Sequence, residues 1–160
     1  MLVKYLFVFF LSMVPIIELR GAVPVAQGYA VLDPNFNLTL AYILIILGNM
    51  IPVPFIFFFA RKVLEWGADK PKIGKFFTFC LEKGHKGGEK LKSTAGPGLY
   101  YALWIFVAIP LPGTGAWTGT LAASFLDMDF KKSVISVMLG VLTAGIIMTL
   151  VSTGVIALIK

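Results

Sequence analysis

The chain has 160 residues, of which 58% are hydrophobic and only 14% are charged, and its formal net charge is +6. Soluble domains carry about 25% charged residues, so this chain has too little polar surface to cover a water-facing fold. The composition excludes a soluble enzyme, a disordered chain and, with a single cysteine, a disulfide scaffold. It indicates an all-α integral membrane protein.

The N-terminal part predicts two short helices followed by a long one. Residues 5–17 are apolar, but 13 residues reach only ~20 Å of the roughly 30 Å hydrocarbon core. Residues 18–21 interrupt this stretch, and residues 22–32 are again largely apolar. We expect a re-entrant hairpin with Gly21 in its turn, followed by a membrane-spanning helix over residues 36–60. A signal peptide over residues 1–28 is the competing interpretation.

The central segment, residues 61–98, is basic. It holds nine Lys or Arg residues against four acids, whereas Lys4 and Lys160 are the basic residues expected on the other side. The positive-inside rule predicts a cytoplasmic loop and two external termini in a cell membrane. Lys75, Phe79 and their neighbours could form an amphipathic helix on the inner leaflet. The charge is therefore a topology signal and a contact with anionic lipids, with no nucleic-acid partner.

The C-terminal part repeats the order of the N-terminal part. Residues 99–111 are a short apolar stretch, residues 112–115 provide turn chemistry, and residues 116–126 are a second short piece. Residues 133–159 contain no charge and are long enough to span with tilt.

An internal repeat follows from a shift of 94 positions. Five of the sixteen positions in 21–36 are identical to those in 115–130, including Leu32, Asp33 and Phe36. We therefore expect two inverted repeats, residues 1–60 and 99–160, each a re-entrant hairpin followed by a transmembrane helix and joined by the cytoplasmic loop 61–98 within one membrane domain.

Glu18 and Arg20 are the most informative residues. At the predicted tip of the first hairpin a charge costs at least about 2.5–3.5 kcal/mol on insertion scales, and such residues usually mark a pathway. A salt bridge between them that fixes the turn is the alternative. Helix N-termini near Gly21 and Gly115, together with Arg20, predict an anion site. Burial favours the neutral form of a carboxyl group, which makes Glu18 the candidate for proton coupling.

At these residues the chain resembles a known family. The runs at residues 18–24 and 109–119 are similar to the two signatures of the small multi-drug export proteins, which are distantly similar to the DedA/VTT superfamily. The DedA likeness implies paired re-entrant hairpins and movement of lipids or small molecules. Glu18 matches the acidic position of DedA proteins. The second hairpin has Thr114 where an arginine is expected, and Arg20 lies in the first hairpin instead.

We accordingly expect a non-enzymatic, homodimeric transporter or flippase without a cofactor, which moves an anionic lipid headgroup or another small molecule and is coupled to protons. The alternatives are a cation or multidrug exporter centred on Glu18 and a non-transporting membrane assembly protein. The expected substrate-binding residues lie at the two hairpin tips and beside them: Glu18, Arg20, Gly21, Pro24, Asn49, Pro110, Pro112, Gly113, Thr114, Gly115, Trp117, Thr118 and Thr120.

Overall fold

A computed structural model describes residues 1–71, 74–75, 78–79, 82, 93, 96–111 and 113–159. The predicted amphipathic helix of the central segment lies largely outside the described residues. Regular structure in the described part is helical, as predicted. Its helices are α1 (Leu2–Met13), α2 (Glu18–Leu32), α3 (Leu38–Met50), α4 (Pro52–Ala68), α6 (Gly98–Ala108), α7 (Ala116–Phe125) and α8 (Phe130–Ile159).

Two helical segments are long and apolar enough to cross a membrane. The first is Leu38–Ala68, with 31 residues, and the second is Phe130–Leu158, with 29 residues. Pro52 starts α4 at a position where a missing N–H is tolerated, so α3 and α4 form one interrupted rod. This rod extends to Ala68, beyond residue 60, the predicted end of the helix. Helices α1 and α6 are too short to span, at about 1.5 Å per residue.

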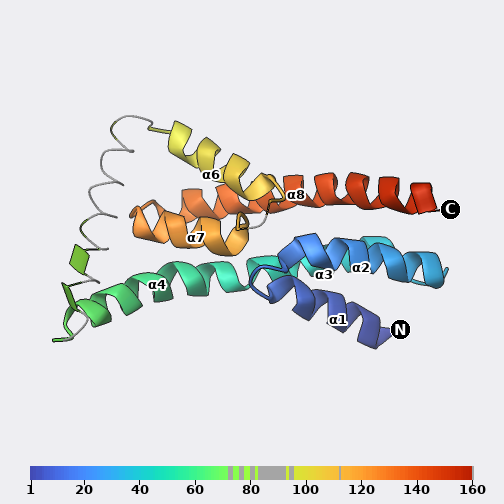
Figure 1. The fold of residues 1–160 in the computed structure, drawn as a ribbon, viewed down its shortest axis with the longest axis horizontal. Helices are drawn as coiled ribbons and strands as arrows, with labels where there is room; N and C mark the ends of the chain where they lie inside the picture. Colours follow the sequence, from blue (N-terminus) through green and yellow to red (C-terminus); the bar gives the residue numbers. More distant parts are fainter. Residues whose placement is uncertain are drawn as a thin grey trace.

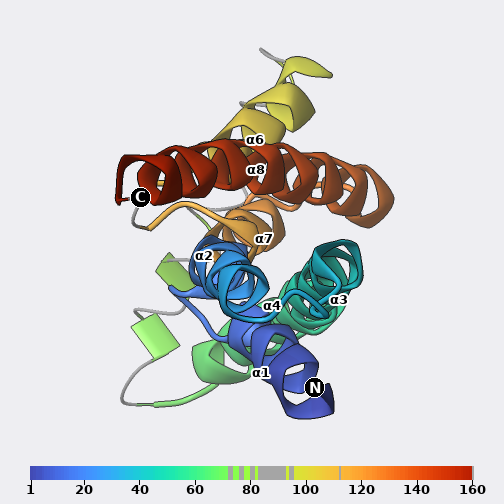
Figure 2. The same cartoon turned by 90° about the vertical axis from the view of Figure 1, so that its right-hand side faces the viewer.

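The short helices form two antiparallel hairpins that enter the bundle from opposite ends (Figure 1). Hairpin 1 consists of α1 and α2, and hairpin 2 consists of α6 and α7. The N-terminus, the α2–α3 loop and the C-terminus lie at one end of the molecule, and the α7–α8 loop lies at the other (Figure 1). Viewed along the bundle, α2 and α7 lie centrally, between α8 and the α3–α4 rod (Figure 2). The two hairpin turns therefore meet at mid-length.

Proline ends the first helix of each hairpin in the same way. The C-cap residues Val14 and Ile109 are both extended, with ψ of 128° and 118°, and each precedes a proline. A residue before proline is driven out of the helical region, which explains both breaks. In hairpin 1, the turn is residues 14–17 and α2 begins at Glu18, so the prediction of Gly21 in the turn is wrong. Positive φ at Ile16 and Glu18, rather than a glycine, reverses the chain there.

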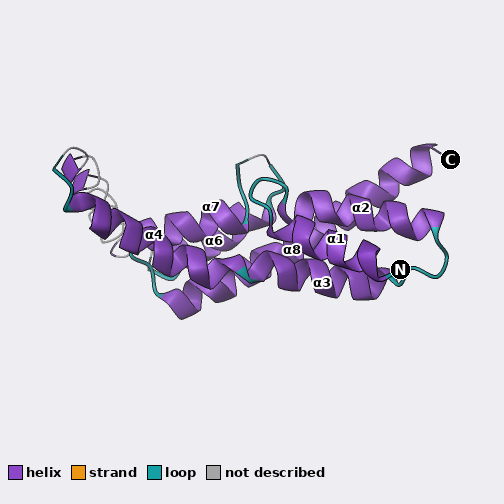
Figure 3. Cartoon of the chain, turned by 90° about the horizontal axis from the view of Figure 1, so that it is seen from below, coloured by secondary structure: helices purple, strands orange, loops and turns teal. Residues whose placement is uncertain are grey.

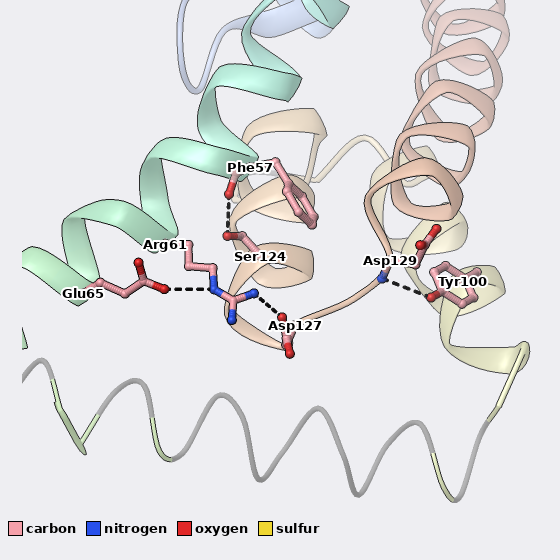
Figure 4. Close-up of polar contacts among 7 residues, drawn as sticks. All are labelled: Phe57, Arg61, Glu65, Tyr100, Ser124, Asp127 and Asp129. Carbon is pink, nitrogen blue, oxygen red and sulfur yellow. Dashed lines mark hydrogen bonds and ion pairs between the residues drawn. The ribbon is translucent and has the colours of Figure 1, made fainter.

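Tyrosine hydroxyls tie each hairpin to the long helix that follows it. The Asn37 N–H donates to the Tyr5 hydroxyl at 2.7 Å, and the Asp129 N–H donates to the Tyr100 hydroxyl at 3.3 Å (Figure 4). Asn37 also caps α3 by accepting from the Leu40 N–H, and Asp129 accepts from the N–H of Lys132 three residues later. The two ends of the bundle are thus built from the same contacts.

An ion pair closes the open end of hairpin 1. Lys4 Nζ donates to the Asp33 carboxylate at 2.7 Å. This hydrogen bond, with a second from the Asn35 N–H, lowers the pKa of Asp33 below its ordinary value. Because the folded-state pKa is lowered, the stabilisation is present above the unfolded-state pKa and is lost as the pH falls through the folded-state value.

Glycines allow the first helix of each hairpin to approach its long helix. A Cβ at Gly48 of α3 would lie 2.5 Å from the Phe9 carbonyl oxygen of α1, and a Cβ at Gly140 of α8 would lie 2.5 Å from Val107 Cβ of α6. Real Cβ atoms do not approach this closely, so both positions require glycine. The close packing at Gly140 therefore occurs inside the chain, between α6 and α8.

Candidate functional site

The carboxylate of Glu18 binds the N-terminus of α7. Its two oxygens accept from the backbone N–H groups of Ala116 at 3.1 Å and Trp117 at 3.0 Å. The first N–H groups of a helix have no partner within the helix and carry partial positive charge, so a carboxylate is stabilised there. Glu18 is only 4% exposed, which makes this a buried charge with two hydrogen bonds and a helix dipole to balance it.

Gly115 makes room for this contact. It is the N-cap of α7, has φ of 139° and supplies no side chain to cap the helix. A Cβ at this position would overlap the Glu18 carboxylate. The backbone conformation and the missing side chain are thus both required, and the cap that α7 lacks locally comes from the opposite hairpin.

The guanidinium of Arg20 binds the segment of hairpin 2 that follows the C-terminal end of α6. It donates to the carbonyl of Leu111, to the carbonyl of Ile109 at 3.2 Å and to Thr114 Oγ1 at 2.7 Å. These carbonyls follow the last turn of α6, where a helix carries partial negative charge and a cation is favourable. Glu18 and Arg20 therefore form no ion pair with each other. Each neutralises a helix end of hairpin 2.

Hairpin 2 contacts hairpin 1 in a similar manner. The Trp117 indole N–H donates to the carbonyl of Met13, the last residue of α1, at 3.2 Å. The first turn of α2 thus supplies a donor to the end of α6, and the first turn of α7 supplies a donor to the end of α1. We name the set Glu18, Arg20, Thr114, Gly115 and Trp117 the clasp.

Asn49 lies beside the clasp. It is 2% exposed, and its Oδ1 atom has no hydrogen-bond partner in the described part of the chain. Asn49, Glu18 and Arg20 line one small cavity of about 10 Å³, roughly the space of a single water. An acceptor without a donor is costly to bury, so Asn49 is a candidate for a functional role.

The remaining predicted residues occupy three kinds of position. Gly21 and Pro24 lie inside α2. Thr118 and Thr120 lie on α7 with hydroxyl oxygens that are buried and have no partner among the described residues. Pro110 and Gly113 lie in the turn of hairpin 2, where Gly113 has φ of 85°, and Pro112 lies outside the described residues.

Further polar contacts between the halves were not predicted. The Gln27 amide of α2 donates to the Tyr42 hydroxyl at 2.8 Å and to the Thr149 carbonyl of α8 at 3.3 Å. At the other end, the Ser124 hydroxyl of α7 donates to the Phe57 carbonyl of α4 at 2.7 Å (Figure 4). Buried polar residues within apolar helices are the sequence signal that could have identified them.

A groove runs between α2, α3 and α8. Its volume is about 470 Å³, a size suited to a small molecule. Leu19, the neighbour of Glu18 and Arg20, lies at the groove, and the hydroxyl-bearing residues Tyr42 and Thr149 also line it. Among the described residues, no charged side chain lines it. An apolar portion of a ligand would be favoured here, next to the charged clasp.

Comparison with known proteins gives one match. A family model described as "Putative small multi-drug export protein" matches residues 18–147, which begins at Glu18 and includes every residue of the clasp. No curated protein and no solved structure matches the chain. Because the family model covers most of the sequence, and because two helices are long and apolar enough to cross a bilayer, the chain is a membrane protein that belongs to the small multi-drug export protein family.

Proposed function

We propose that the chain is a transporter built from two inverted repeats, each a re-entrant hairpin followed by a spanning helix. The opposite entry of the two hairpins in Figure 1 supports this arrangement. The Tyr5–Asn37 and Tyr100–Asp129 contacts support it further, because in each half a tyrosine of the first short helix accepts from the backbone N–H just before the spanning helix. In this proposal the basic central segment is cytoplasmic, and both termini lie outside.

The contact between Glu18 and the α7 N-terminus carries the proposal. The N–H groups of Ala116 and Trp117 are an anion site that the chain's own carboxylate fills. A proton on Glu18 removes its charge and weakens this contact, which frees both N–H groups for another anion. Asn49 Oδ1, in the same small cavity, is a ready acceptor for the carboxyl O–H. The Glu18 carboxylate and a bound anion thus compete for the same two N–H groups, so proton binding to Glu18 favours anion binding.

The substrate class follows from the surroundings of the clasp. We propose an amphiphile whose anionic headgroup replaces Glu18 at α7 and whose apolar part occupies the groove of about 470 Å³. The chain binds and moves this molecule without covalent chemistry. The second candidate is export of a lipophilic cation that pairs with Glu18, which the family description and the absence of charge in the groove favour.

The contacts at the two ends of the bundle suggest how access alternates. Gln27 joins α2 to α8 near one end, and Ser124 joins α7 to α4 near the other. Each pair links the returning helix of one hairpin to the spanning helix of the opposite repeat. If the Gln27–Thr149 contact breaks while the Ser124–Phe57 contact is kept, or the reverse, the clasp becomes accessible from one side of the membrane at a time.

We also propose that two copies associate. The hairpin turns lie together at mid-length of the spanning helices (Figure 3). They carry exposed apolar side chains, among them Ile16, which is 87% exposed. Non-helical backbone at membrane depth requires cover by protein or water. A second copy over these turns provides it. Native mass spectrometry is expected to show a dimer, and a monomer that transports would contradict this part.

Transport measurements on reconstituted vesicles test the coupling. Purified wild-type protein and Glu18→Gln are placed in liposomes with an imposed pH gradient. Two fluorescent probes are followed, a labelled phosphatidylglycerol as the anionic amphiphile and ethidium as the lipophilic cation. Wild type is expected to move the anionic lipid faster as the pH falls. Glu18→Gln, which is permanently neutral, is expected to lose this pH dependence.

Glu65→Gln is the matched control. Glu65 lies on α4 outside the clasp, with 57% of its side chain exposed, so its neutralisation is expected to leave the pH dependence unchanged. Movement of ethidium alone, abolished by Glu18→Gln, would favour the cation exporter. An unchanged pH profile in Glu18→Gln, or a folded wild type that moves neither probe, would contradict the proposal.

A further inference from the structure

A second groove lies at the end of the bundle that carries the basic central segment, away from the clasp. It runs between the beginnings of α6 and α8 and has a volume of about 280 Å³. Three aromatic residues line it, Tyr100, Tyr101 and Trp104, and Lys132 is the charged residue that lines it in the described part of the chain. Aromatic rings beside a lysine are typical of the region where a bilayer meets water.

The ammonium group of Lys132 contacts an aromatic ring but no carboxylate among the described residues. Lys132 lies in the first turn of α8, where the helix dipole disfavours a cation. Its ammonium group lies 5.6 Å from the centre of the Tyr100 ring and forms no ion pair with a carboxylate of the described residues. The nearby Asp129 carboxylate instead caps the helix by accepting from the Lys132 backbone N–H at 2.9 Å. Figure 4 shows Asp129 next to Tyr100 at this end.

Two other cations near the ends of the bundle, Lys4 and Arg61, are paired with carboxylates. Lys4 binds Asp33, and Arg61 binds Asp127 and Glu65 (Figure 4). Lys132 differs because it combines an unbalanced charge with an apolar, aromatic groove. A phosphate group would balance the charge, and an acyl chain would fill the groove.

We propose that the groove between α6 and α8 is a binding site for an anionic phospholipid, with the headgroup phosphate on Lys132 and one acyl chain along Trp104 and Leu139. The site is separate from the clasp, so it does not depend on what the protein transports. A lipid held here would bridge the first helix of hairpin 2 to its spanning helix, at the end where α6 begins.

Native mass spectrometry with added lipid tests this site. Wild type, Lys132→Gln and Leu139→Trp are each titrated with phosphatidylglycerol and with phosphatidylcholine. Lys131→Gln is the matched control, because Lys131 is an exposed neighbour that does not line the groove. Lys132→Gln is expected to weaken phosphatidylglycerol binding severalfold, because it removes the charge-assisted contact with the headgroup phosphate. Lys131→Gln is expected to bind as wild type does.

Leu139→Trp separates the groove from the charge. Leu139 is partly exposed at the groove, so a larger ring is expected to fill it and to reduce phosphatidylglycerol binding while Lys132 remains. Equal losses in Lys131→Gln and Lys132→Gln would show general surface attraction and would overturn the site. Full binding by Leu139→Trp, or no preference of wild type for phosphatidylglycerol over phosphatidylcholine, would also overturn it.

Discussion

Gly115→Ala is expected to destabilise the protein by about 3 kcal/mol or more, because strained backbone and an uncompensated buried charge each cost on the order of kilocalories. The φ of 139° at this position is unfavourable for any residue with a Cβ. The new methyl group would also overlap the Glu18 carboxylate and push it from the N–H groups of Ala116 and Trp117. Thermal unfolding in detergent, followed by circular dichroism, measures the change.

Gly154→Ala is the control for this substitution. A Cβ at Gly154, on α8, meets nothing within 4 Å, and the residue has ordinary helical geometry. Alanine favours a helix over glycine by up to about 1 kcal/mol, so this variant is expected to be unchanged or slightly more stable. A Gly115→Ala protein that unfolds at the wild-type temperature would show that Glu18 does not approach the α7 N-terminus as described.

Arg20→Met is expected to cost at least about 3 kcal/mol, because it removes three charge-assisted hydrogen bonds. Each contributes roughly 1.5–3 kcal/mol, and contributions within one network do not add fully. The carbonyls of Ile109 and Leu111 would lose this donor. Methionine keeps the length and apolar stem of the side chain, so the loss reports the guanidinium. Arg20→Lys is expected to restore part of the stability, because a single ammonium cannot bind three acceptors in a fork.

Arg61→Met provides the same substitution at an exposed ion pair. Arg61 contacts Asp127 and Glu65 with about half of its side chain exposed (Figure 4). Exposed pairs contribute roughly 0–1 kcal/mol, so this variant is expected to stay within about 1 kcal/mol of wild type. Equal losses for Arg20→Met and Arg61→Met would contradict a special role for the contact between Arg20 and hairpin 2.

The sequence was sufficient to predict the helices but not the contacts between the hairpins. Apolar length identified two long and four short pieces, but it placed the breaks at residues 18–21 and 112–115. The first helix of each hairpin ends earlier, before Pro15 and Pro110, because the residue preceding a proline is driven out of the helical region. The hairpin turns meet because each short helix is too brief to span. That Glu18 binds α7 and Arg20 binds α6 could not be predicted, because spacing along one chain does not show which faces of distant segments meet.

The misplaced turn of hairpin 1 has an identifiable cause. The repeat aligned Gly21 with Gly115, and glycine is the usual residue for reversed backbone. Gly115 is indeed the N-cap of α7, whereas α2 begins three residues before Gly21. Two signals favoured the earlier start: Pro15 as a helix stop and Glu18 as an acid suited to a first helical turn. Glu18 has a positive φ, which is unfavourable for a residue with a side chain. The hydrogen bonds between its carboxylate and the α7 N-terminus favour this conformation.

Single-cysteine labelling with a membrane-impermeant thiol reagent tests the central claim most directly, namely that two hairpins enter from opposite sides and meet inside the membrane. In a Cys80→Ser background, cysteines replace the exposed residues Asn35, Lys131 and Ile16. Asn35→Cys and Lys131→Cys are expected to label from opposite sides of the membrane. Ile16→Cys, in the turn of hairpin 1, is expected to label more slowly than either of them, whichever side the reagent is added to. Labelling of Asn35→Cys and Lys131→Cys from one side, or rapid labelling of Ile16→Cys from the side of Lys131, would contradict the account.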